Sequence, residues 1–449
     1  MQWVRPDDAG YDEARTLFNA MIDRRPAVIA QCTDAADVRE ALAMARKHGL
    51  EVAVRSGGHS VAGMSMIDGG LVVDVRPMKR ISFDAESRTA TVGGGVTWGE
   101  FDRAGQELGL ATTGGRVTTT GVSGFTLGGG SGWLDRAWGL ACDNLVSVDL
   151  VTASGNEVTA SATENPELFW ALHGGGGNFG VATSFTFNLH DVGPEVFCGL
   201  LLWPADAARD AALAFRDYVH SSPEALGANL VGVIAPPEDF VPAQMHGKPA
   251  LAMVIVHAGS VEEGREAVRP LQELAPAADI LAPRPYAEFQ GMLDDEPGQF
   301  NYWSADYHDQ FPDEAVDVFL DYGKTLPHES SQLLLAPWGG AAARVDPAST
   351  PMARRTSRWV SHPFALWRDP AQTEEAIGWA RGFRRDIAAF TSGGVYLNFI
   401  GHEGQDRIKA AFGAENYARL ARLKGEYDPE NVFRGNQNIQ PATAEPAAP

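Results

Sequence analysis

Residues 55–78, "RSGGHSVAGMSMIDGGLVVDVRPM", join two apolar runs that are typical of β-strands. The run "EVAVR" (51–55) leads into the stretch, and "GLVVDVR" (70–76) continues from its loop. Between them lies a glycine-rich loop that carries a single histidine, His59. Glycine lets backbone N–H groups turn inward and approach an anion closely. The stretch therefore predicts a strand, an anion-binding loop and a second strand.

The neighbouring sequence continues this alternation of strands and helices. Thr33 is the expected N-cap of a helix, and Gly49 lies just past its end. Thr97 and Glu100 form a capping box at the start of another helix, after a strand and a glycine turn. Residues 144–161 have the pattern of a hairpin. The first part of the chain is therefore predicted to be an α/β region.

The chain has 449 residues, more than one ordinary hydrophobic core contains. After about Pro194, longer strands alternate with helical segments, which predicts an antiparallel sheet backed by helices. From about Asn398 the character of the first part returns, so the second part is predicted to be an insertion. The expected fold class is α+β. The expected divisions are a first domain at 1–194, which the resemblance described below makes the FAD-binding domain, a substrate-binding domain at 195–397, a returning segment at 398–440 and a disordered tail at 441–449.

The chain is acidic, with 58 Asp+Glu against 36 Lys+Arg. Nucleic acid and anionic membranes need a basic surface, so neither is an expected partner. We find no apolar run of membrane-spanning length and no signal-peptide core, and we predict a cytoplasmic protein. The cysteines Cys32, Cys142 and Cys198 are too scattered for a disulfide framework or a zinc site, so no metal is expected.

Glycines cluster in four places, which suggests a cofactor that bears phosphate, although any single loop can equally be a tight turn. The clusters lie at 57–58, 93–95, 128–132 and 174–177. The last has the spacing of a dinucleotide fingerprint, but a helix precedes it and a strand follows, the reverse of that motif. The chain also lacks a G-x-S-x-G elbow and an H-E-x-x-H pair, so a hydrolase is not predicted.

Five segments, in this order, resemble the FAD-linked oxidases of the vanillyl-alcohol oxidase and p-cresol methylhydroxylase (PCMH) superfamily, in its berberine bridge enzyme-like branch. They are "VAVRSGGHS", "GVSGFTLGGGSGWLDRAWGLACDNL", "NPELFWALHGGGGNFGVATSF", "GGVYLNF" and "YDPENVFRGNQNI". The resemblance runs almost from end to end, and five segments in order are strongly specific. It implies a PCMH-type FAD-binding domain, FAD as cofactor and an oxidoreductase that acts on a small molecule.

The resemblance also implies a role for His59. In the family, the histidine of R-S-G-G-H is bonded covalently to the 8α-methyl carbon of the flavin, and the loop amides hold the FAD pyrophosphate. A neutral imidazole is a nucleophile suited to that bond. The other interpretations are a hydrogen-bonded loop histidine and, for the asparagines, ordinary turn chemistry. The implied cofactor-binding residues are Arg55, Ser56, Gly57, Gly58, His59, Ser60, Thr118, Thr120, Gly121, Ser123, Val181, Asn436 and Asn438.

The sequence departs from the family where some relatives carry a second covalent link. Val117 occupies the position of that cysteine, and Cys142 lies too far along the chain to replace it. We therefore predict a single link at His59, as in the branch that includes 6-hydroxynicotine oxidase. Sugar oxidation, associated mainly with doubly linked forms, becomes less expected. Thr120 stands at a position that gates oxygen in plant members, and its likeness in shape to valine favours an oxidase.

A second departure lies in "FNYWSADYHDQF" (300–311), where Ser304 replaces a family lysine that helps amine oxidation. Amine oxidation is therefore less expected, although Asp306 or His308 is a nearby candidate base. Aromatic side chains of this part are candidates for the substrate pocket or for the core. They are Tyr302, Trp303, Tyr307, Trp338 and Trp359.

Tyr396 and Asn398 of "GGVYLNF" match a Tyr-x-Asn motif whose tyrosine is the catalytic base in some relatives. In a strand both side chains point to one face, so both are predicted to be catalytic unless Tyr396 is a core residue. Tyr396, with a lowered pKa, is expected to take a proton from a substrate hydroxyl. Hydride then passes to flavin N5, and O2 restores the flavin and yields hydrogen peroxide.

The predicted function is that of a covalent-FAD oxidase for an alcohol or phenol-like metabolite, in secondary metabolism. Four alternatives stay open: a dehydrogenase of the same fold with another electron acceptor, an enzyme of amine or C–N oxidation, a non-catalytic flavoprotein and, weakened by the motif context, a nicotinamide-dependent enzyme. The expected partners are the small-molecule substrate and O2, and the protein is expected to be a monomer or a homodimer.

Overall fold

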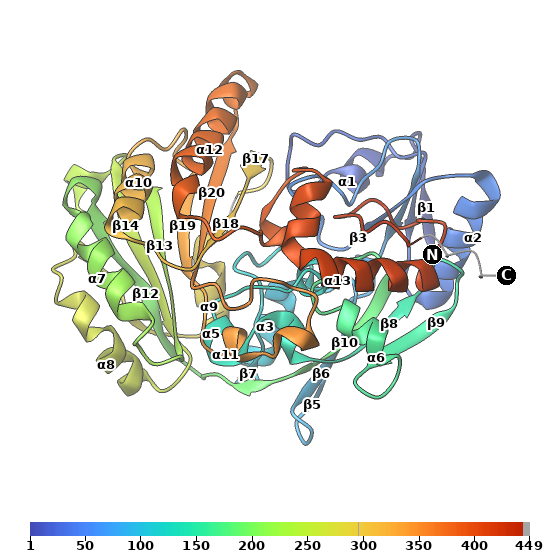
Figure 1. Ribbon diagram of the computed structural model, residues 1–449, viewed down its shortest axis with the longest axis horizontal. Coiled ribbons are helices and arrows are strands. Elements are labelled where there is room, and N and C mark those ends of the chain that lie inside the picture. Colours follow the sequence, from blue (N-terminus) through green and yellow to red (C-terminus); the bar gives the residue numbers. More distant parts are fainter. Residues whose placement is uncertain (295, 443–449) are drawn as a thin grey trace.

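The computed structural model describes residues 1–294 and 296–442 (Figure 1). Its first part holds two sheets, of which one carries the glycine-rich loop. In this four-stranded sheet, of order β1-β2-β4-β3, the strands β3 and β4 run parallel on either side of the loop. A strand, a loop and a second strand are therefore confirmed. The strands are β1 (Gln2–Val4), β2 (Val28–Gln31), β3 (Val52–Arg55) and β4 (Leu71–Asp74).

The second sheet of this part has the order β5-β6-β10-β8-β9 and is antiparallel throughout. The predicted hairpin is confirmed as β8 paired with β9. The strands are β5 (Ile81–Asp84), β6 (Thr89–Gly93), β8 (Leu145–Val151), β9 (Glu157–Ser161) and β10 (Val181–Asn188). Two short strands, β7 (Leu110–Ala111) and β11 (His190–Asp191), form a separate antiparallel pair.

The helices of the first part begin and end much as their capping residues predict. Glu100 accepts the backbone N–H of Thr97 at 2.8 Å in the predicted capping box, and Gly49 ends its helix with a φ of +66°. The N-cap prediction for Thr33 is wrong: Asp34 caps that helix, while the Thr33 hydroxyl donates to Asp37 at 2.7 Å. The helices are α1 (Tyr11–Arg15), α2 (Ala35–His48), α3 (Trp98–Gln106), α4 (Val122–Leu127), α5 (Asp135–Trp138) and α6 (Pro166–Ala171).

The second part is a large sheet with the order β15-β12-β14-β13-β19-β20-β17, which β16 and β18 extend. Its strands pair antiparallel, so the predicted α+β fold is confirmed. The strands are β12 (Val196–Pro204), β13 (Leu226–Ile234), β14 (Pro249–His257), β15 (Ala278–Asp279), β16 (Ala282–Arg284), β17 (Phe300–Trp303), β18 (Asp306–His308), β19 (Gln332–Pro337) and β20 (Trp359–Trp367).

Side chains alternate between the two faces of this sheet. Leu333 and Leu335 of β19 pack into a core with helices α7, α8, α10 and α12, which cover the outer side (Figure 1). Leu334 and Ala336 point the other way, into a core that includes Trp133 of the first part. The helices are α7 (Arg209–Val219), α8 (Val261–Gln272), α9 (Tyr286–Gln290), α10 (Asp313–Gly323), α11 (Ala341–Arg344) and α12 (Thr373–Ile387).

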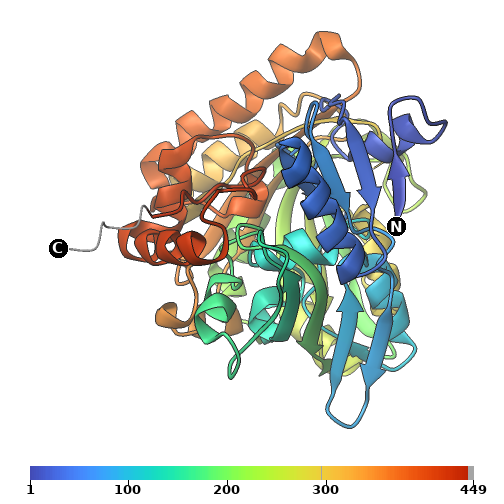
Figure 2. The same ribbon diagram turned by 90° about the vertical axis from the view of Figure 1, so that its right-hand side faces the viewer.

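After the large sheet, the chain returns to the first part through helix α13 (Gln405–Tyr427), which is interrupted at Gly413 with a φ of +74°. Leu420 and Ala421 of α13 share a core with Leu168 of α6. Figure 2 shows this helix, in red, at the side of the molecule. The arrangement supports the predicted insertion, and the domain bounds remain a prediction. The tail prediction at 441–449 falls mostly on residues outside the described range. Among the described helices, none has the length and apolar content to cross a membrane.

Two half-buried histidines predict how stability depends on pH. His190 stacks on Trp138 at 4.4 Å, and His220 lies edge-on to Trp359 at 4.6 Å. Burial lowers the pKa of each from its ordinary 6.5 to about 4. Between these two pH values the unfolded chain binds protons that the folded protein does not. Stability should therefore fall as pH drops from 6.5 to 4, by at most about 1.4 kcal/mol per pH unit for each histidine.

Chemical denaturation across this pH range measures the effect. His190→Gln should flatten the slope, whereas His48→Gln, at an exposed position of α2, should leave it unchanged. An unchanged slope in His190→Gln contradicts the prediction.

Candidate active site

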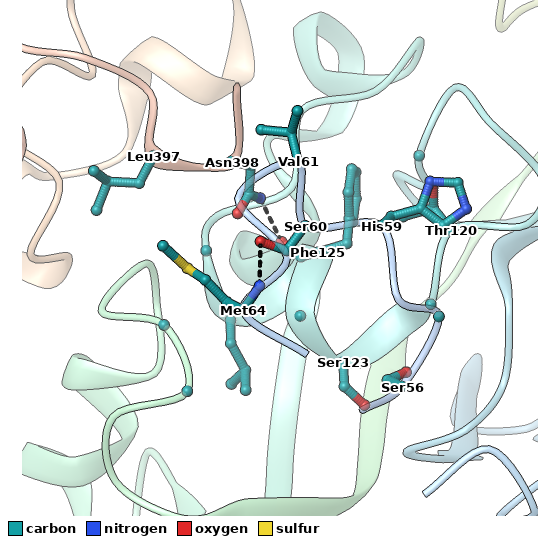
Figure 3. A pocket seen from close by; sticks show the side chains of 18 of the residues that line it. Ser56, His59, Ser60, Val61, Met64, Thr120, Ser123, Phe125, Leu397 and Asn398 are labelled. Atoms are coloured by element: carbon teal, nitrogen blue, oxygen red, sulfur yellow. Dashed lines mark hydrogen bonds between the residues drawn. The ribbon is translucent and has the colours of Figure 1, made fainter. Parts of the chain in front are cut away.

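A large cavity lies between the first part and the inner face of the large sheet (Figure 3). The space between its lining atoms, out to its open mouth, is about 2090 Å³. Loop residues 56–60, the segment 115–128 and the turn 174–177 line one side. Strands β17, β19 and β20 line the opposite side. The cavity is therefore large enough for a dinucleotide-sized cofactor together with a small substrate.

Two glycine loops meet in this cavity, backbone against backbone. A Cβ atom on Gly57 would lie 2.2 Å from the nitrogen of Gly121, and one on Gly121 would lie 2.3 Å from the nitrogen of Gly57. The hydroxyls of Ser56 and Ser123 both donate to the carbonyl of Gly94, at 2.8 and 2.5 Å. Only glycine permits this approach, so the two loops form one rigid wall with exposed amides.

His59 lies in this wall beside Thr120 (Figure 3). Its ring stacks on Phe18 with 4.1 Å between centroids, and its Nε2 lies 2.8 Å from the Thr119 hydroxyl oxygen. Burial lowers the pKa of His59 to about 4, so the imidazole is neutral at neutral pH. A neutral ring held in one orientation keeps a lone pair available for a nucleophilic attack.

Most of the predicted cofactor-binding residues line the cavity. They are Ser56, Gly57, Gly58, His59, Ser60, Thr120, Gly121, Ser123 and Asn436. Asn436 donates to the carbonyls of Phe433 and Gly177 at 2.8 and 3.2 Å, while its side-chain oxygen is buried without a partner. The returning segment thereby reaches the glycine turn at 174–177 and leaves one hydrogen-bond acceptor for a ligand.

Four predicted cofactor-binding residues do not line the cavity in the described part of the chain. The buried Arg55 guanidinium donates to the carbonyls of Ala14 and Thr16, so it braces the loop from behind. Thr118 faces away, with its backbone N–H 2.7 Å from Asp294. Val181 packs in the core beneath the four-stranded sheet. The Asn438 carbonyl accepts from Gln405 at 3.2 Å, and its side-chain oxygen is buried without a partner.

The predicted catalytic pair differs from expectation in three ways. Tyr396 and Asn398 are not in a strand, because Gly393 and Gly394 adopt positive φ values and a 3-10 turn follows at Leu397–Phe399. Asn398 lines the cavity, but Tyr396 is 1% exposed and points under the loop at 128–131. Burial raises the pKa of Tyr396 rather than lowering it. A catalytic base at Tyr396 is therefore not supported.

Tyr396 has a bracing role instead. Its hydroxyl oxygen accepts the backbone N–H groups of Gly130 and Ser131 at 2.7 and 2.9 Å, and the Asn398 amide at 3.0 Å. The same amide donates to the carbonyl of Phe125 at 2.9 Å (Figure 3). These bonds tie the segment after the large sheet to helix α4 and the loop that follows it.

Ser304, Asp306 and His308 do not line the cavity. The Ser304 hydroxyl donates to Glu403 at 2.5 Å, and Asp306 is paired with Arg384 and Arg407 at 2.9 and 3.1 Å. Both ring nitrogens of His308 are engaged, by the Phe390 carbonyl and the Ser361 hydroxyl. The suggestion of Asp306 or His308 as a base is therefore wrong for this structure.

Among the predicted pocket aromatics, Trp303 lines the cavity. Tyr307, Trp338 and Trp359 lie in the cores, and Tyr302 packs beside one of them. Among the lining residues of the large-sheet side or its border that sequence reasoning missed, three are polar: Arg116, Gln332 and His362. The signal for His362 was a histidine inside the apolar run "WVSHPFALW" (359–367).

Comparisons with known proteins agree with this architecture. A family model described as "FAD binding domain" matches residues 26–161, and one described as "Berberine and berberine like" matches residues 395–440. (R)-6-hydroxynicotine oxidase of Paenarthrobacter nicotinovorans is 32% identical over 458 residues, which cover 98% of this chain and 96% of that protein. The chain belongs to the berberine bridge enzyme-like family of FAD-linked oxidoreductases.

Solved structures of the family support the fold. The crystal structure of 6-hydroxy-D-nicotine oxidase from Arthrobacter nicotinovorans superposes with a TM-score of 0.88, at 29% identity and 98% coverage of both chains. Physcomitrella patens BBE-like 1 superposes with a TM-score of 0.85 at 22% identity, covering 99% of this chain and 97% of that one. Another relative, the FAD-linked oxidoreductase YgaK of Bacillus subtilis, is 29% identical over 98% of this chain and 96% of its own length.

The cavity fits the cofactor that the family name implies. The glycine wall offers backbone amides that suit a pyrophosphate, and nothing lies within 4 Å of a Cβ built on Gly124 or Gly177. The unpartnered Asn436 oxygen suits an N–H donor of the flavin. FAD is therefore the cofactor of this enzyme, and these residues are the ones that would hold it.

No cysteine thiol lines the described cavity to form a second link to the flavin. Val117, at the position of the second link in other members, lines the cavity with an apolar side chain. Cys32, Cys142 and Cys198 are free and buried, and burial raises the pKa of the Cys142 thiol well above its usual range. None of the three lines the described cavity.

Proposed function

We propose that the protein is an FAD-dependent oxidase with a single covalent link at His59, acting on a small alcohol or phenol-like molecule. The observation that carries the link is the neutral His59 ring, held by Phe18 and Thr119 in the loop that also presents amides to the cofactor. Val117 and the buried thiols support a single attachment. FAD, when bound, accepts a hydride from the substrate carbon and passes the electrons to O2, which yields hydrogen peroxide.

The substrate side of the cavity favours an uncharged, largely apolar molecule. Trp303, Phe364 and Phe399 line it, together with apolar side chains of the sheet. Arg116 also lines it and is paired with the buried Asp135 at 3.8 Å, and none of the lining residues in the described part of the chain is an aspartate or a glutamate. A cationic amine would find no carboxylate in this lining, so the alternative of amine oxidation has less support.

An oxidase is favoured over a dehydrogenase because Thr120 lines the cavity at the oxygen-gating position. Its side chain is small and branched, which leaves room for O2 beside the flavin ring. The dehydrogenase of the same fold remains the second candidate function, with a different electron acceptor.

Anaerobic mixing with neutral aromatic alcohols tests the proposal. The visible flavin absorbance should bleach, and admission of air should restore it with one hydrogen peroxide released for each flavin reduced. Bleaching that only an artificial acceptor reverses would indicate the dehydrogenase. Bleaching by amines alone would overturn the proposed substrate class.

A further inference from the structure

Five side chains form a wall on the inner face of the large sheet: Trp303, Gln332, Leu334, His362 and Phe364. In the strand register, Gln332 lies opposite Phe364 and Leu334 lies opposite His362, while Trp303 lies opposite Phe364 on the other side of β20. Residues two apart in a strand share a face, so these five point together. All five line the cavity. This sheet-face wall is rigid because hydrogen-bonded strands carry it.

His362 is the one member of the sheet-face wall with an unsatisfied buried polar atom in the described part of the chain. Its Nδ1 lies 2.7 Å from the Ser304 carbonyl oxygen, which can only accept, so Nδ1 carries the hydrogen. Nε2 therefore has a bare lone pair, and it is buried without a partner in a residue that is 3% exposed. A buried acceptor without a donor is costly unless a ligand supplies one.

The surroundings hold this ring in place and keep it neutral. His362 stacks on Phe399 with centroids 4.3 Å apart and planes 5° apart. The rings of Trp303 and Phe364 are nearly perpendicular to it, with centroids at 5.9 and 5.2 Å. Burial lowers the pKa of His362 to about 4, and the positive charge of Arg116 acts in the same direction. Nε2 is therefore an acceptor of hydrogen bonds at neutral pH.

The sheet-face wall also presents aromatic side chains to the cavity. Trp303 and Phe364 are stacked, with centroids 4.3 Å apart and planes 23° apart, so they present a broad aromatic surface. Aromatic side chains of this kind favour stacking or edge contacts with another ring. The lining has no carboxylate in the described chain, so an uncharged donor, such as a hydroxyl, matches Nε2 better than an ammonium group.

We propose that the substrate is an uncharged aromatic compound whose hydroxyl donates to Nε2 of His362, and that Nε2 takes the hydroxyl proton during oxidation. In the reaction the O–H and C–H bonds of the carbinol break and its C=O bond forms. The proton goes to Nε2 and then to solvent, and the hydride goes to the flavin, as the proposed function requires. This inference rests on that function for the hydride step, whereas the binding step stands alone.

Ligand binding to the oxidised holoenzyme tests the binding step without turnover. Phenol has the hydroxyl but no carbinol hydrogen to lose, and anisole has the same ring without the donor. We expect isothermal titration to give phenol an advantage of about tenfold or more over anisole. His362→Phe, which keeps a ring against Phe399, should remove this preference. His362→Gln, which can return an acceptor oxygen, should restore part of it.

Leu334→Met is the matched control, because it changes the same wall without touching the acceptor. Both affinities should change together, so the preference for phenol should persist. In steady-state kinetics with aromatic alcohols, His362→Phe should lower kcat/KM by about 10²–10⁴-fold. Its flavin content and its reoxidation by air should match those of the wild type.

The outcomes separate this inference from the proposed function. Equal binding of phenol and anisole by the wild type overturns the role of His362, even where an alcohol bleaches the flavin. A preference for phenol that His362→Phe abolishes supports the binding role, even where no alcohol bleaches the flavin and the proposed function fails. Phenol preference retained in a folded, flavin-loaded His362→Phe variant overturns the inference.

Discussion

His59→Ala should abolish the covalent attachment of the flavin to the polypeptide. After acid precipitation, the wild-type pellet is expected to keep the yellow colour, and the variant pellet to lose it to the supernatant. The reason is that His59 is the lining residue whose neutral ring is oriented beside the cofactor loops, held by Phe18 and Thr119. The glycine wall remains intact in the variant, so FAD should still bind without a bond to the chain.

Peptide mass spectrometry supplies the control and the contrary result. In the wild type, the flavin mass should lie on the peptide that contains His59 and on no other. Val117→Ala and Cys142→Ala should keep that attachment, because neither position is proposed to bond the flavin. A flavin that remains on the chain in His59→Ala would show a different anchor and contradict the proposal.

Asp428→Ala should destabilise the protein by about 3–5 kcal/mol, the usual cost of leaving a buried charge without its partner. Lys424 and Asp428 are both fully buried and 2.6 Å apart. The Lys424 ammonium also donates to the carbonyls of Asn178 and Phe433, at 2.8 and 3.0 Å. Loss of the carboxylate therefore strands a cation, and it also frees the N–H of Phe433, which Asp428 accepts at 2.8 Å.

Urea denaturation of the flavin-free and flavin-loaded protein measures this change. The matched control is Glu157→Gln, which removes a carboxylate from an exposed pair with Arg39 and should cost less than about 1 kcal/mol. The double variant Lys424→Met with Asp428→Leu should recover much of the loss, since it removes both charges. A midpoint for Asp428→Ala equal to that of the wild type would contradict the prediction.

Local sequence patterns predicted the parts of the fold that depend on nearby residues. The strands around the glycine loop, the capping box of Thr97 and Glu100 and the hairpin of β8 and β9 follow from short-range chemistry, and all are present. The order of five motifs predicted the family and FAD. The N-cap at Asp34 was missed because two adjacent residues could both serve, and their choice depends on Asp37.

The catalytic residues were harder to predict because their environments are built from distant segments. Tyr396 was expected beside the flavin, but its hydroxyl binds backbone atoms about 265 residues earlier in the chain. His362 lies in an ordinary apolar strand, and only the register of β19, β20 and β17 shows that it faces the cavity. The burial of Lys424 has no local sequence signal, because two of its partners, Asn178 and Phe433, reach it only in the folded chain.

The returning segment sets the order of events when the enzyme is made. Asn436 completes one wall of the cofactor site, and Lys424 holds that wall through its hydrogen bond to the Asn178 carbonyl. Both residues are synthesised after the whole of the large sheet. During translation, the loop of His59 is made hundreds of residues before Asn436, so the cofactor site is incomplete until the returning segment has been synthesised. We therefore expect tight FAD binding, and with it the proposed bond to His59, only after the whole chain has been made, and a pulse-labelled nascent chain that is stalled before α13 should carry no bound flavin.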